Sequence, residues 1–268
     1  LKQVEKIYHF LSTNYFGRDS AIIAVGGGIT GDLAGFIAST YIRGIKYFQV
    51  PTTLLSMVDS SVGGKTGVNF NQQKNLIGTF YQPNAVYIYP GFLSTLTQKE
   101  LISGAGEVFK YSLLADKRNY LLLKKSMAKL FSRKEVNYKS LIAACLKIKS
   151  NIVMHDEKEL KVIRKILNLG HTFAHAFEVE SNYKLKHGEA VIAGIFCALM
   201  LSEIVGYINK EKINLFLNDL SFIEINRLVR DLDPESVYKI MEGDKKNYSS
   251  RICLILIDKY SLKKKTPK

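Results

Sequence analysis

Three of the five histidines of this chain lie within one short stretch, at His171, His175 and His187. On a helix, side chains four residues apart share one face, so His171 and His175 have a workable spacing for two metal ligands. The intervening Thr-Phe-Ala excludes the HExxH pattern of zinc proteases. Spacing leaves open whether His171 pairs with His175 or with His187, and the pair four apart is the simpler choice. With an asparagine and two glutamates close by, the stretch indicates a metal or catalytic site, and core histidines are the alternative.

A glycine-rich segment near the N-terminus indicates a second kind of chemistry. Gly26, Gly28 and Gly31 form a G-x-G-x-x-G pattern directly after the apolar run 21–25. Such glycines let backbone amides approach a pyrophosphate at the N-terminus of a helix. The acidic residue that binds the ribose about 20 positions later is absent, because residues 49–53 are Gln-Val-Pro-Thr-Thr. The segment predicts dinucleotide binding outside the standard Rossmann pattern, and a tight turn is the alternative.

Charged residues in further predicted loops could hold a polar ligand. Residues 59–66 end like a phosphate-binding P-loop, but Asp59 stands where that motif requires glycine, which excludes a nucleoside triphosphatase. A glycine-rich turn that presents Lys65 beside Asp59 still suits a polar ligand. Lys74 and Asn75 add a cation and an amide in a second predicted loop.

Other charged residues do not indicate a site when each is considered alone. Glu107 and Lys110 are three residues apart on a predicted helix, and this spacing predicts an ordinary surface ion pair. Lys149 and Arg164 lie on further predicted helices, and residues 244–246 lie near the C-terminus. Taken singly, each of these is most simply a solvated charge.

The elements that must position these residues change character along the chain. In the first part, helical periodicity over 1–16 and 32–41 alternates with short apolar runs. These runs predict strands at 21–25, 47–50 and 86–89. The alternation of strands and helices predicts a parallel sheet with crossover helices.

From about residue 96 the pattern becomes helical. Apolar residues recur at helical spacing over 96–114, 138–154 and 189–206. The run 252–257 is an exception and reads as a strand. We therefore predict an α/β nucleotide-binding domain with a parallel sheet over 1–95 and a mainly α-helical domain over 96–268.

Composition excludes several classes of protein. Hydrophobic residues make up 47% of the 268 residues, which is typical of a globular chain. The longest apolar run, 190–201, is too short to span a membrane. The three cysteines lack C-x-x-C spacing, which argues against a thiolate zinc site and fits a reducing cytoplasm. The net charge of +14 favours anionic ligands in principle, but lysines on solvated surfaces explain it more simply, so nucleic-acid binding is not predicted.

Several longer motifs follow one another along the chain. They are GGGITGDLAGFIASTYIRGI, VPTTLLSMVDSSVGGKTGVN, KNLIGTFYQP, SGAGEVFKYSLL, and LNLGHTFAHAFE with KHGEAV. In these motifs and their order the chain resembles the 3-dehydroquinate synthase family, from about residue 1 to residue 258. The resemblance implies an N-terminal α/β nucleotide-binding domain and a C-terminal α-helical domain, with the site in the cleft between them.

The resemblance also implies two cofactors. A divalent metal, zinc or cobalt, would be held by Glu107, His171 and His187, with His175 on the substrate side as an acid–base or hydrogen-bonding residue. Two neutral imidazoles and one carboxylate leave a coordination position open for substrate hydroxyls, as a catalytic zinc requires. The second cofactor is NAD. The residues implied to contact it are Gly28, Ile29, Thr30, Gly31, Asp32, Thr52, Thr53, Lys65, Lys74, Phe92, Leu93, Ser94 and Thr95.

The implied activity is that of a phosphorus–oxygen lyase of the shikimate pathway, which leads to the aromatic amino acids. It converts 3-deoxy-D-arabino-heptulosonate 7-phosphate to 3-dehydroquinate and phosphate through transient oxidation by NAD, β-elimination, reduction and aldol closure. The alternatives are a related cyclase such as an inosose or valiolone synthase, a polyol dehydrogenase, and an inactive fragment or binding module.

The implied substrate contacts are cationic and polar, as a small phosphorylated keto acid requires. The phosphate would meet Lys65, Asn75, Asn168, Lys246 or its neighbour Lys245, and Arg43 from the second subunit of a homodimer. The carboxylate would meet Lys149 and Arg164, which can hold it bidentately. Asp59 and Lys110 would hold a ring hydroxyl. Neither a membrane nor a nucleic acid is implied as partner, and the implied location is the cytoplasm.

Two departures from the family pattern are present. The family has a glutamate four residues before the arginine that matches Arg164, but residue 160 is leucine and Glu159 is one place away. Either a one-residue insertion lets Glu159 serve, or that contact is lost. The chain also begins at Leu1, so we expect its NAD-binding domain to lack an N-terminal part that the family has.

Overall fold

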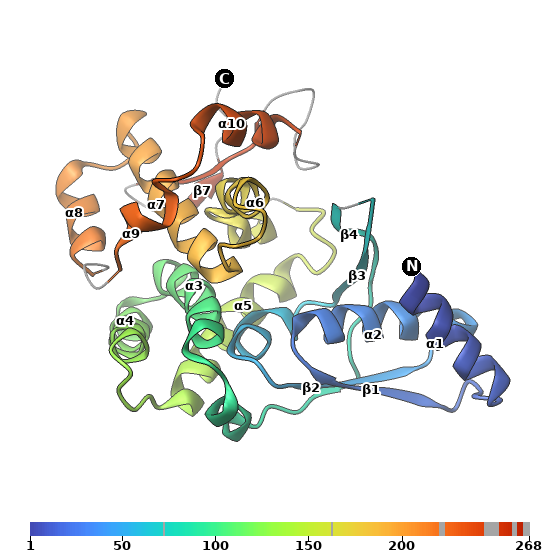
Figure 1. Cartoon of the computed structure of the whole chain (residues 1–268). Helices are drawn as coiled ribbons and strands as arrows, with labels where there is room; N and C mark the ends of the chain where they lie inside the picture. Colours follow the sequence, from blue (N-terminus) through green and yellow to red (C-terminus); the bar gives the residue numbers. More distant parts are fainter. Residues whose placement is uncertain (72, 162, 220–222, 244–251, 259–261, 265–268) are drawn as a thin grey trace.

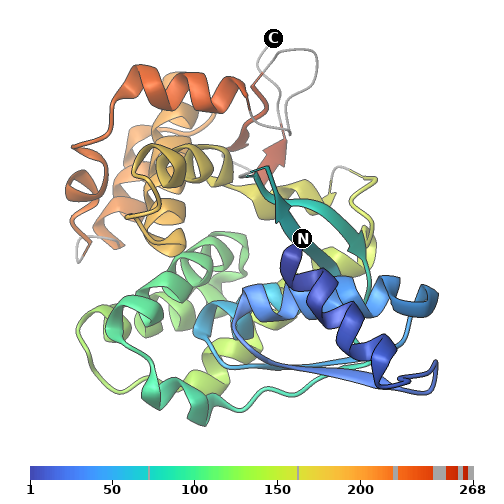
Figure 2. The same cartoon turned by 45° about the vertical axis from the view of Figure 1, so that its right-hand side comes forward.

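The computed structural model describes all residues except 72, 162, 220–222, 244–251, 259–261 and 265–268. An α/β half and a mainly helical half lie against each other (Figure 1 and Figure 2). The elements of the α/β half are α1 (Lys2–Thr13), β1 (Ala21–Gly26), α2 (Gly28–Thr40), the 3-10 turn η1 (Tyr41–Arg43), β2 (Lys46–Pro51), the π-helix η2 (Ser56–Ser60), β3 (Lys65–Phe70), β4 (Gln73–Phe80), β5 (Ala85–Val86) and the 3-10 helix η3 (Pro90–Thr95). The elements of the helical half are α3 (Gln98–Leu114), α4 (Lys117–Phe131), α5 (Tyr138–His155), the 3-10 helix η4 (Ile163–Asn168), α6 (His171–Glu180), α7 (His187–Ile204), α8 (Lys210–Asp219), α9 (Ile225–Val229), α10 (Pro234–Glu242), β6 (Ile255–Ile257) and β7 (Leu262–Lys264).

A three-stranded parallel sheet in the order β1-β2-β5 forms the base of the α/β half, as the sequence predicts. β1 and β2 pair over their whole length, and α2 makes the crossover between them. Ala38 of α2 packs with Ala24 of β1 and Tyr47 of β2. The carboxyl ends of β1 and β2 therefore meet the N-terminus of α2, which is the edge where open α/β sheets bind ligands.

An antiparallel hairpin of β3 and β4 rises from the α/β half toward the helical half (Figure 1). The predicted loop around Lys74 and Asn75 is therefore wrong, because both residues lie in β4, and Lys65 begins β3. Most of β4 is exposed or half-exposed, so it lacks the regular burial that an apolar pattern records. Pairing with β3 stabilises it instead, and this pairing is not visible in local spacing.

The main hydrophobic core lies in the helical half and is centred on α7. This helix is apolar on all sides, since it packs against both α3 and α6. By length and composition alone it could cross a membrane, but 56% of its apolar window is buried inside the molecule. Burial on several faces is what a central helix of a globular domain requires.

The other predicted elements differ from the observed ones mainly at their ends. The helices predicted over 96–114, 138–154 and 189–206 are confirmed as α3, α5 and α7. The strand predicted over 86–89 is wrong in length, because β5 pairs with β2 only at Ala85–Val86. The domain boundary predicted at residues 95/96 falls between η3 and α3, and the division into two domains stays a prediction.

Candidate active site

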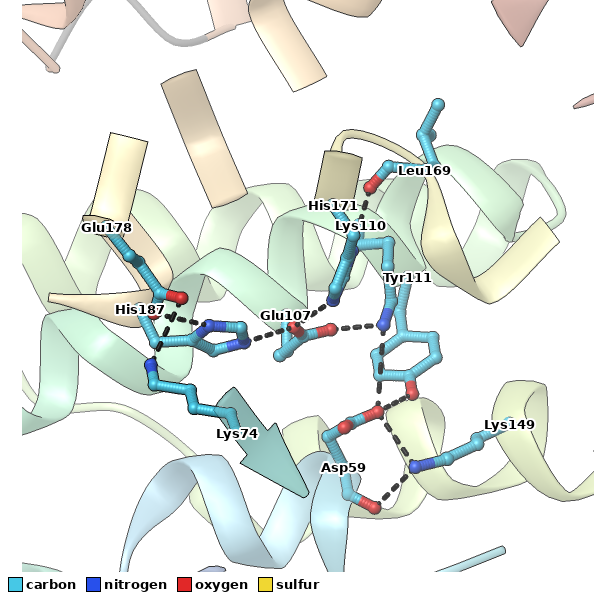
Figure 3. A network of polar contacts seen from close by, with 10 residues as sticks. All are labelled: Asp59, Lys74, Glu107, Lys110, Tyr111, Lys149, Leu169, His171, Glu178 and His187. Atoms are coloured by element: carbon cyan, nitrogen blue, oxygen red, sulfur yellow. Dashed lines mark hydrogen bonds and ion pairs between the residues drawn. The ribbon is translucent and has the colours of Figure 1, made fainter. Parts of the chain in front are cut away.

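A carboxylate of α3 meets two imidazoles, which belong to the first residues of α6 and α7 (Figure 3). Glu107 Oε1 lies 3.3 Å from His171 Nε2 and 3.1 Å from His187 Nε2. Within the described part of the chain, these three residues are the group of potential metal ligands, with one atom from each within 4.8 Å of the others. His175 is not part of this group, and its ring stands edge-on to that of His171 with the centroids 5.9 Å apart.

Glycines in contact bring these ligands together. A Cβ on Gly106 of α3 would overlap the backbone of Gly188 in α7, so the two helices cross in direct main-chain contact. Their chain neighbours, Glu107 and His187, therefore face each other. Gly170, with φ of +74°, makes a similar contact with α7 at Gly194, and this contact sets the start of α6 at His171.

The second nitrogen of each imidazole is also held. His171 Nδ1 lies 3.1 Å from the carbonyl oxygen of Leu169, and His187 Nδ1 lies 3.2 Å from Glu178 Oε1. Both rings therefore turn Nε2 toward Glu107. Burial lowers the pKa of His187, but the hydrogen bonds to Glu107 and Glu178 outweigh it and raise the pKa to about 9. Burial raises the pKa of Glu107, but Lys110 and His171 hold it well below its usual range.

This donor set fits a divalent metal ion. Four ligands at the usual zinc distances of about 2.0–2.1 Å stand about 3.4 Å apart in a tetrahedron. The two separations from Glu107 Oε1, 3.3 Å and 3.1 Å, are close to this value. The donors are two imidazole nitrogens and one carboxylate oxygen, the set typical of catalytic zinc, which keeps one position open. The carboxylates of Glu107 and Glu178 stabilise a proton on His187, and they would stabilise a metal cation at this centre in the same way.

A second carboxylate, Asp59, lies next to the first and is surrounded by cations (Figure 3). Its Oδ1 lies 2.9 Å from Lys149 Nζ and 3.7 Å from Lys110 Nζ, and it accepts a hydrogen bond from the Tyr111 hydroxyl. Burial raises the pKa of Asp59, but the two lysines outweigh it and lower the pKa to about 2. Burial lowers the pKa of Lys149, whereas Glu107 and Asp59 keep the pKa of Lys110 raised.

Lys110 joins the two carboxylates. It forms an ion pair with Glu107, and the exposed fractions of the two residues are 2% and 0%. The prediction of a surface ion pair is therefore wrong. Spacing three apart reports only that two side chains share a helix face, and this face of α3 is buried in the helical core.

A cationic group lies where the hairpin meets the loop before η4. Lys65 forms an ion pair with Glu159, and Glu159 Oε1 also accepts a hydrogen bond from Asn168 Nδ2 at 3.1 Å. The Arg164 side chain is buried and donates to the carbonyl oxygen of Gly63 at 2.7 Å. Leu160 is 85% exposed, so Glu159 is the residue that faces the site.

Seven of the thirteen residues implied for cofactor binding lie at the carboxyl ends of β1 and β2. Residues 28–32 begin α2, and Thr52 and Thr53 follow β2, with the Thr52 amide bonded to the carbonyl oxygen of Gly26 at 2.9 Å. Asn75 Nδ2 donates to Asp32 Oδ2 at 2.9 Å, while burial raises the pKa of Asp32 to about 6. Residues 92–95 lie in η3.

Four implied residues are not brought to the site by their side chains or lie outside the described residues. Arg43 is exposed in η1, at the opposite end of α2 from residues 28–32. Lys245 and Lys246 lie outside the described residues. The Leu93 side chain is buried in the helical core, so only its main chain is available to a ligand.

Comparisons with known proteins identify the family of this chain. The family model described as 3-dehydroquinate synthase N-terminal matches residues 1–103, and the one described as C-terminal matches residues 104–247. The chain belongs to the 3-dehydroquinate synthase family. It is 45% identical over 263 residues to the 3-dehydroquinate synthase of Pelagibacter ubique (strain HTCC1062), covering 96% of this chain and 71% of that protein. The identity to that of Alkaliphilus oremlandii (strain OhILAs) is 44% over 257 residues, covering 95% and 70%.

Solved structures share the fold of this family member. A 2-deoxy-scyllo-inosose synthase complexed with carbaglucose-6-phosphate, NAD+ and Co2+ superposes with a TM-score of 0.86 at 26% identity, over 99% of this chain and 72% of that one. A probable glycerol dehydrogenase from Sinorhizobium meliloti 1021 reaches a TM-score of 0.63 at 13% identity, over 92% and 74%. The second likeness concerns the fold alone.

Two site residues, Tyr111 and Glu178, were not predicted as such from the sequence, and Glu159 was left as one of two alternatives. Tyr111 lies in a motif of the family but carries no charge that would single it out. Glu178 lies within the histidine stretch and has the side chain of a metal ligand, yet it contacts His187 from outside the cluster of three. Glu159 could be found only by comparing the spacing before Arg164 with the family pattern.

Proposed function

We propose that this chain catalyses the 3-dehydroquinate synthase reaction, the conversion of 3-deoxy-D-arabino-heptulosonate 7-phosphate to 3-dehydroquinate and phosphate. Family membership over nearly the whole chain supports the activity. The observation that carries the proposal is the Glu107, His171 and His187 cluster beside Asp59 and its lysines. A donor set for a metal thus lies next to groups that can hold a substrate hydroxyl and move its proton.

Glu107, His171 and His187 would hold a zinc or cobalt ion, and residues 28–32 with Thr52 and Thr53 would hold NAD. When bound, the ion supplies Lewis acidity toward a substrate hydroxyl and NAD accepts and returns a hydride. The related 2-deoxy-scyllo-inosose synthase was solved with NAD+ and Co2+, which supports this pair of cofactors. Lys65 and Lys74, at the start of β3 and in β4, would contact NAD from the hairpin, with η3 residues 92–95 on the far side.

The cationic residues would bind the two anionic ends of the substrate. Lys149 and Arg164 are buried and suit the carboxylate, which a guanidinium can hold bidentately. Lys65, Asn75 and Asn168 suit the phosphate. We further propose that Lys246 or Lys245 and, from a second subunit of a homodimer, Arg43 complete this anion site.

Proton transfer would fall to groups around the reacting hydroxyls. Asp59 stays ionised because Lys149 and Lys110 hold its pKa low, so it can accept a hydrogen bond from a ring hydroxyl. His175 faces the same side of α6 as His171 and would act as the acid–base group on the substrate side. Oxidation next to a C–H bond makes its proton acidic, and loss of phosphate by β-elimination follows. Reduction and aldol closure then leave no net redox change.

The test is phosphate release from the heptulosonate phosphate by this chain with NAD and zinc. We expect one phosphate per 3-dehydroquinate and no accumulation of NADH. Accumulation of NADH with glycerol and no phosphate release would favour the polyol dehydrogenase alternative. Tight binding of NAD without turnover would favour a binding module.

The three cysteines are free in the structure, and we propose the cytoplasm as the location.

A further inference from the structure

Glu178 is a buried carboxylate that the proposed reaction does not use. It lies in α6 and is 3% exposed. Both of its oxygens are engaged: Oε1 lies 3.2 Å from His187 Nδ1, and Oε2 lies 3.1 Å from Lys74 Nζ (Figure 3). Burying a carboxylate costs free energy unless it is paired, and both partners here carry or share a proton. The negative charge of Glu178 is therefore needed for its contacts with His187 and Lys74.

The contact with His187 fixes which nitrogen of its ring faces Glu107. A carboxylate acceptor at Nδ1 keeps a proton on that nitrogen, so Nε2, 3.1 Å from Glu107 Oε1, is the nitrogen that would give its electron pair to a metal ion in place of its proton. His171 is held differently, by the main-chain carbonyl of Leu169. The partner of Nδ1 in His187 is thus a side chain, which a substitution can change.

Lys74 holds the other side of the carboxylate. Its ammonium lies between Glu178 Oε2 and the face of the Tyr183 ring, 4.7 Å from the ring centroid. Lys74 belongs to β4, and Glu178 and Tyr183 belong to the helical half. The hairpin of the α/β half thus reaches a residue that touches an implied metal ligand.

We propose that Glu178 is a positioning residue of the metal centre, which orients His187 toward Glu107 and is itself held in place by Lys74. The inference rests on the proposed function, in that His187 binds the metal. The nearby Glu189 does not orient His187, because its carboxylate caps α7 by accepting a hydrogen bond from the Lys186 amide at 2.9 Å. Hydrogen-bond partners of metal-binding histidines raise ligand basicity and fix the ring.

The experiment measures the zinc affinity of the whole chain by competition with a chromophoric chelator. Loss of such a partner weakens metal binding by about 10–100-fold, so we expect this for Glu178→Ala and a smaller loss for the isosteric Glu178→Gln. Lys74→Met should weaken zinc by less than Glu178→Ala, and the double variant by less than the product of the two losses. The visible spectrum of the cobalt form should shift in both Glu178 variants, since the field at the ion changes.

Glu180→Gln is the matched control. It removes the charge of a carboxylate on the same helix whose partner is the hydroxyl of Ser236, and it should leave zinc affinity and the cobalt spectrum unchanged. The urea midpoint of each metal-free variant separates misfolding from a lost orientation, and Glu178→Gln keeps the shape of the side chain if Glu178→Ala fails to fold. Wild-type affinity and spectrum in both Glu178→Gln and Lys74→Met would overturn the inference alone. Absence of a one-to-one zinc site in the unmodified chain would overturn the proposed metal centre and the inference together.

Discussion

The buried carboxylate of Glu107 and the half-buried carboxylate of Asp59 differ in their contacts. Glu107 contacts two imidazoles and one ammonium, whereas Asp59 contacts two ammonium groups and a phenol. An imidazole can exchange its proton for a metal ion, but a protonated lysine repels a cation. The comparison supports the proposal that the metal ion binds on the Glu107 side and the anionic or hydroxyl-bearing substrate on the Asp59 side. Lys110 contacts both carboxylates and separates the two functions.

The largest expected effect comes from removing a ligand on the Glu107 side. His187→Ala should abolish one-to-one zinc binding and lower kcat roughly 10³-fold or more, because the metal supplies several kcal/mol of charge stabilisation. Zinc content and phosphate release measure the two effects. The control is His155→Ala at an exposed residue at the end of α5, which should behave as the unmodified chain. Full zinc content in the His187→Ala chain would contradict the proposal that the metal binds on the Glu107 side.

A smaller effect is expected on the Asp59 side. Asp59→Asn should leave zinc affinity unchanged and lower kcat about 10²-fold, the lower end for loss of a group that handles protons. It also leaves Lys149 and Lys110 with less neutralising charge, so the free energy of unfolding should fall. Parallel zinc titration and urea unfolding separate these outcomes. Loss of zinc in this variant would mean that the two carboxylates act as one unit.

Removing the phenol tests how Asp59 is oriented. Tyr111→Phe deletes one hydrogen bond to a charged acceptor, worth about 1.5 kcal/mol, and should lower kcat about tenfold. The KM for substrate should change less than kcat, because the two lysines still hold the carboxylate. Tyr15→Phe, at a residue that is 93% exposed, is the control. An unchanged kcat would show that the lysines alone orient Asp59.

The smallest effect concerns stability and separates Asp59 from a third carboxylate, Asp32. Burial raises the pKa of Asp32 from 3.8 to about 6, so its contribution is full below pH 3.8 and is lost as the pH rises through about 6. Asp32→Asn should therefore stabilise the cofactor-free chain at pH 8 by about 1–3 kcal/mol and change nothing at pH 3.5.

Urea unfolding at both pH values measures the difference. Asp59 has the opposite sign: its pKa is lowered to about 2, so its contribution is present above pH 3.8 and is lost as the pH falls toward 2. A lower stability of Asp32→Asn at pH 8 would show that the charged form of Asp32 is favoured by the fold.

The elements with strong local patterns could be predicted from the sequence. β1 is a continuous apolar run, β2 is apolar except at Lys46 and Gln49, and α3, α5 and α7 are rich in apolar residues over a helical length. The β3–β4 hairpin could not be predicted in this way. Its strands are rich in polar residues and glycine and are held by pairing with each other, which no periodicity records.

The site was harder to predict from spacing than from resemblance. Helical spacing favours His171 with His175, whereas the structure clusters His171 with His187 and with Glu107, which precedes His187 by 80 residues. Ligand distances depend on how α3, α6 and α7 cross, and local spacing carries no information on crossings. The resemblance implied this set of three, and its role in metal binding stays a prediction until zinc is measured.

The contact of Gly106 with Gly188 has a consequence for how the site tolerates change. Distances between helices that touch through side chains drift as those side chains are replaced and repack. Here main chain meets main chain, so no rotamer can lengthen or shorten the approach beside Glu107 and His187. The main-chain contact therefore fixes the distance between the two helices, and with it the size of ion that the proposed ligands can enclose. Substitutions elsewhere in the core can accumulate without changing this distance.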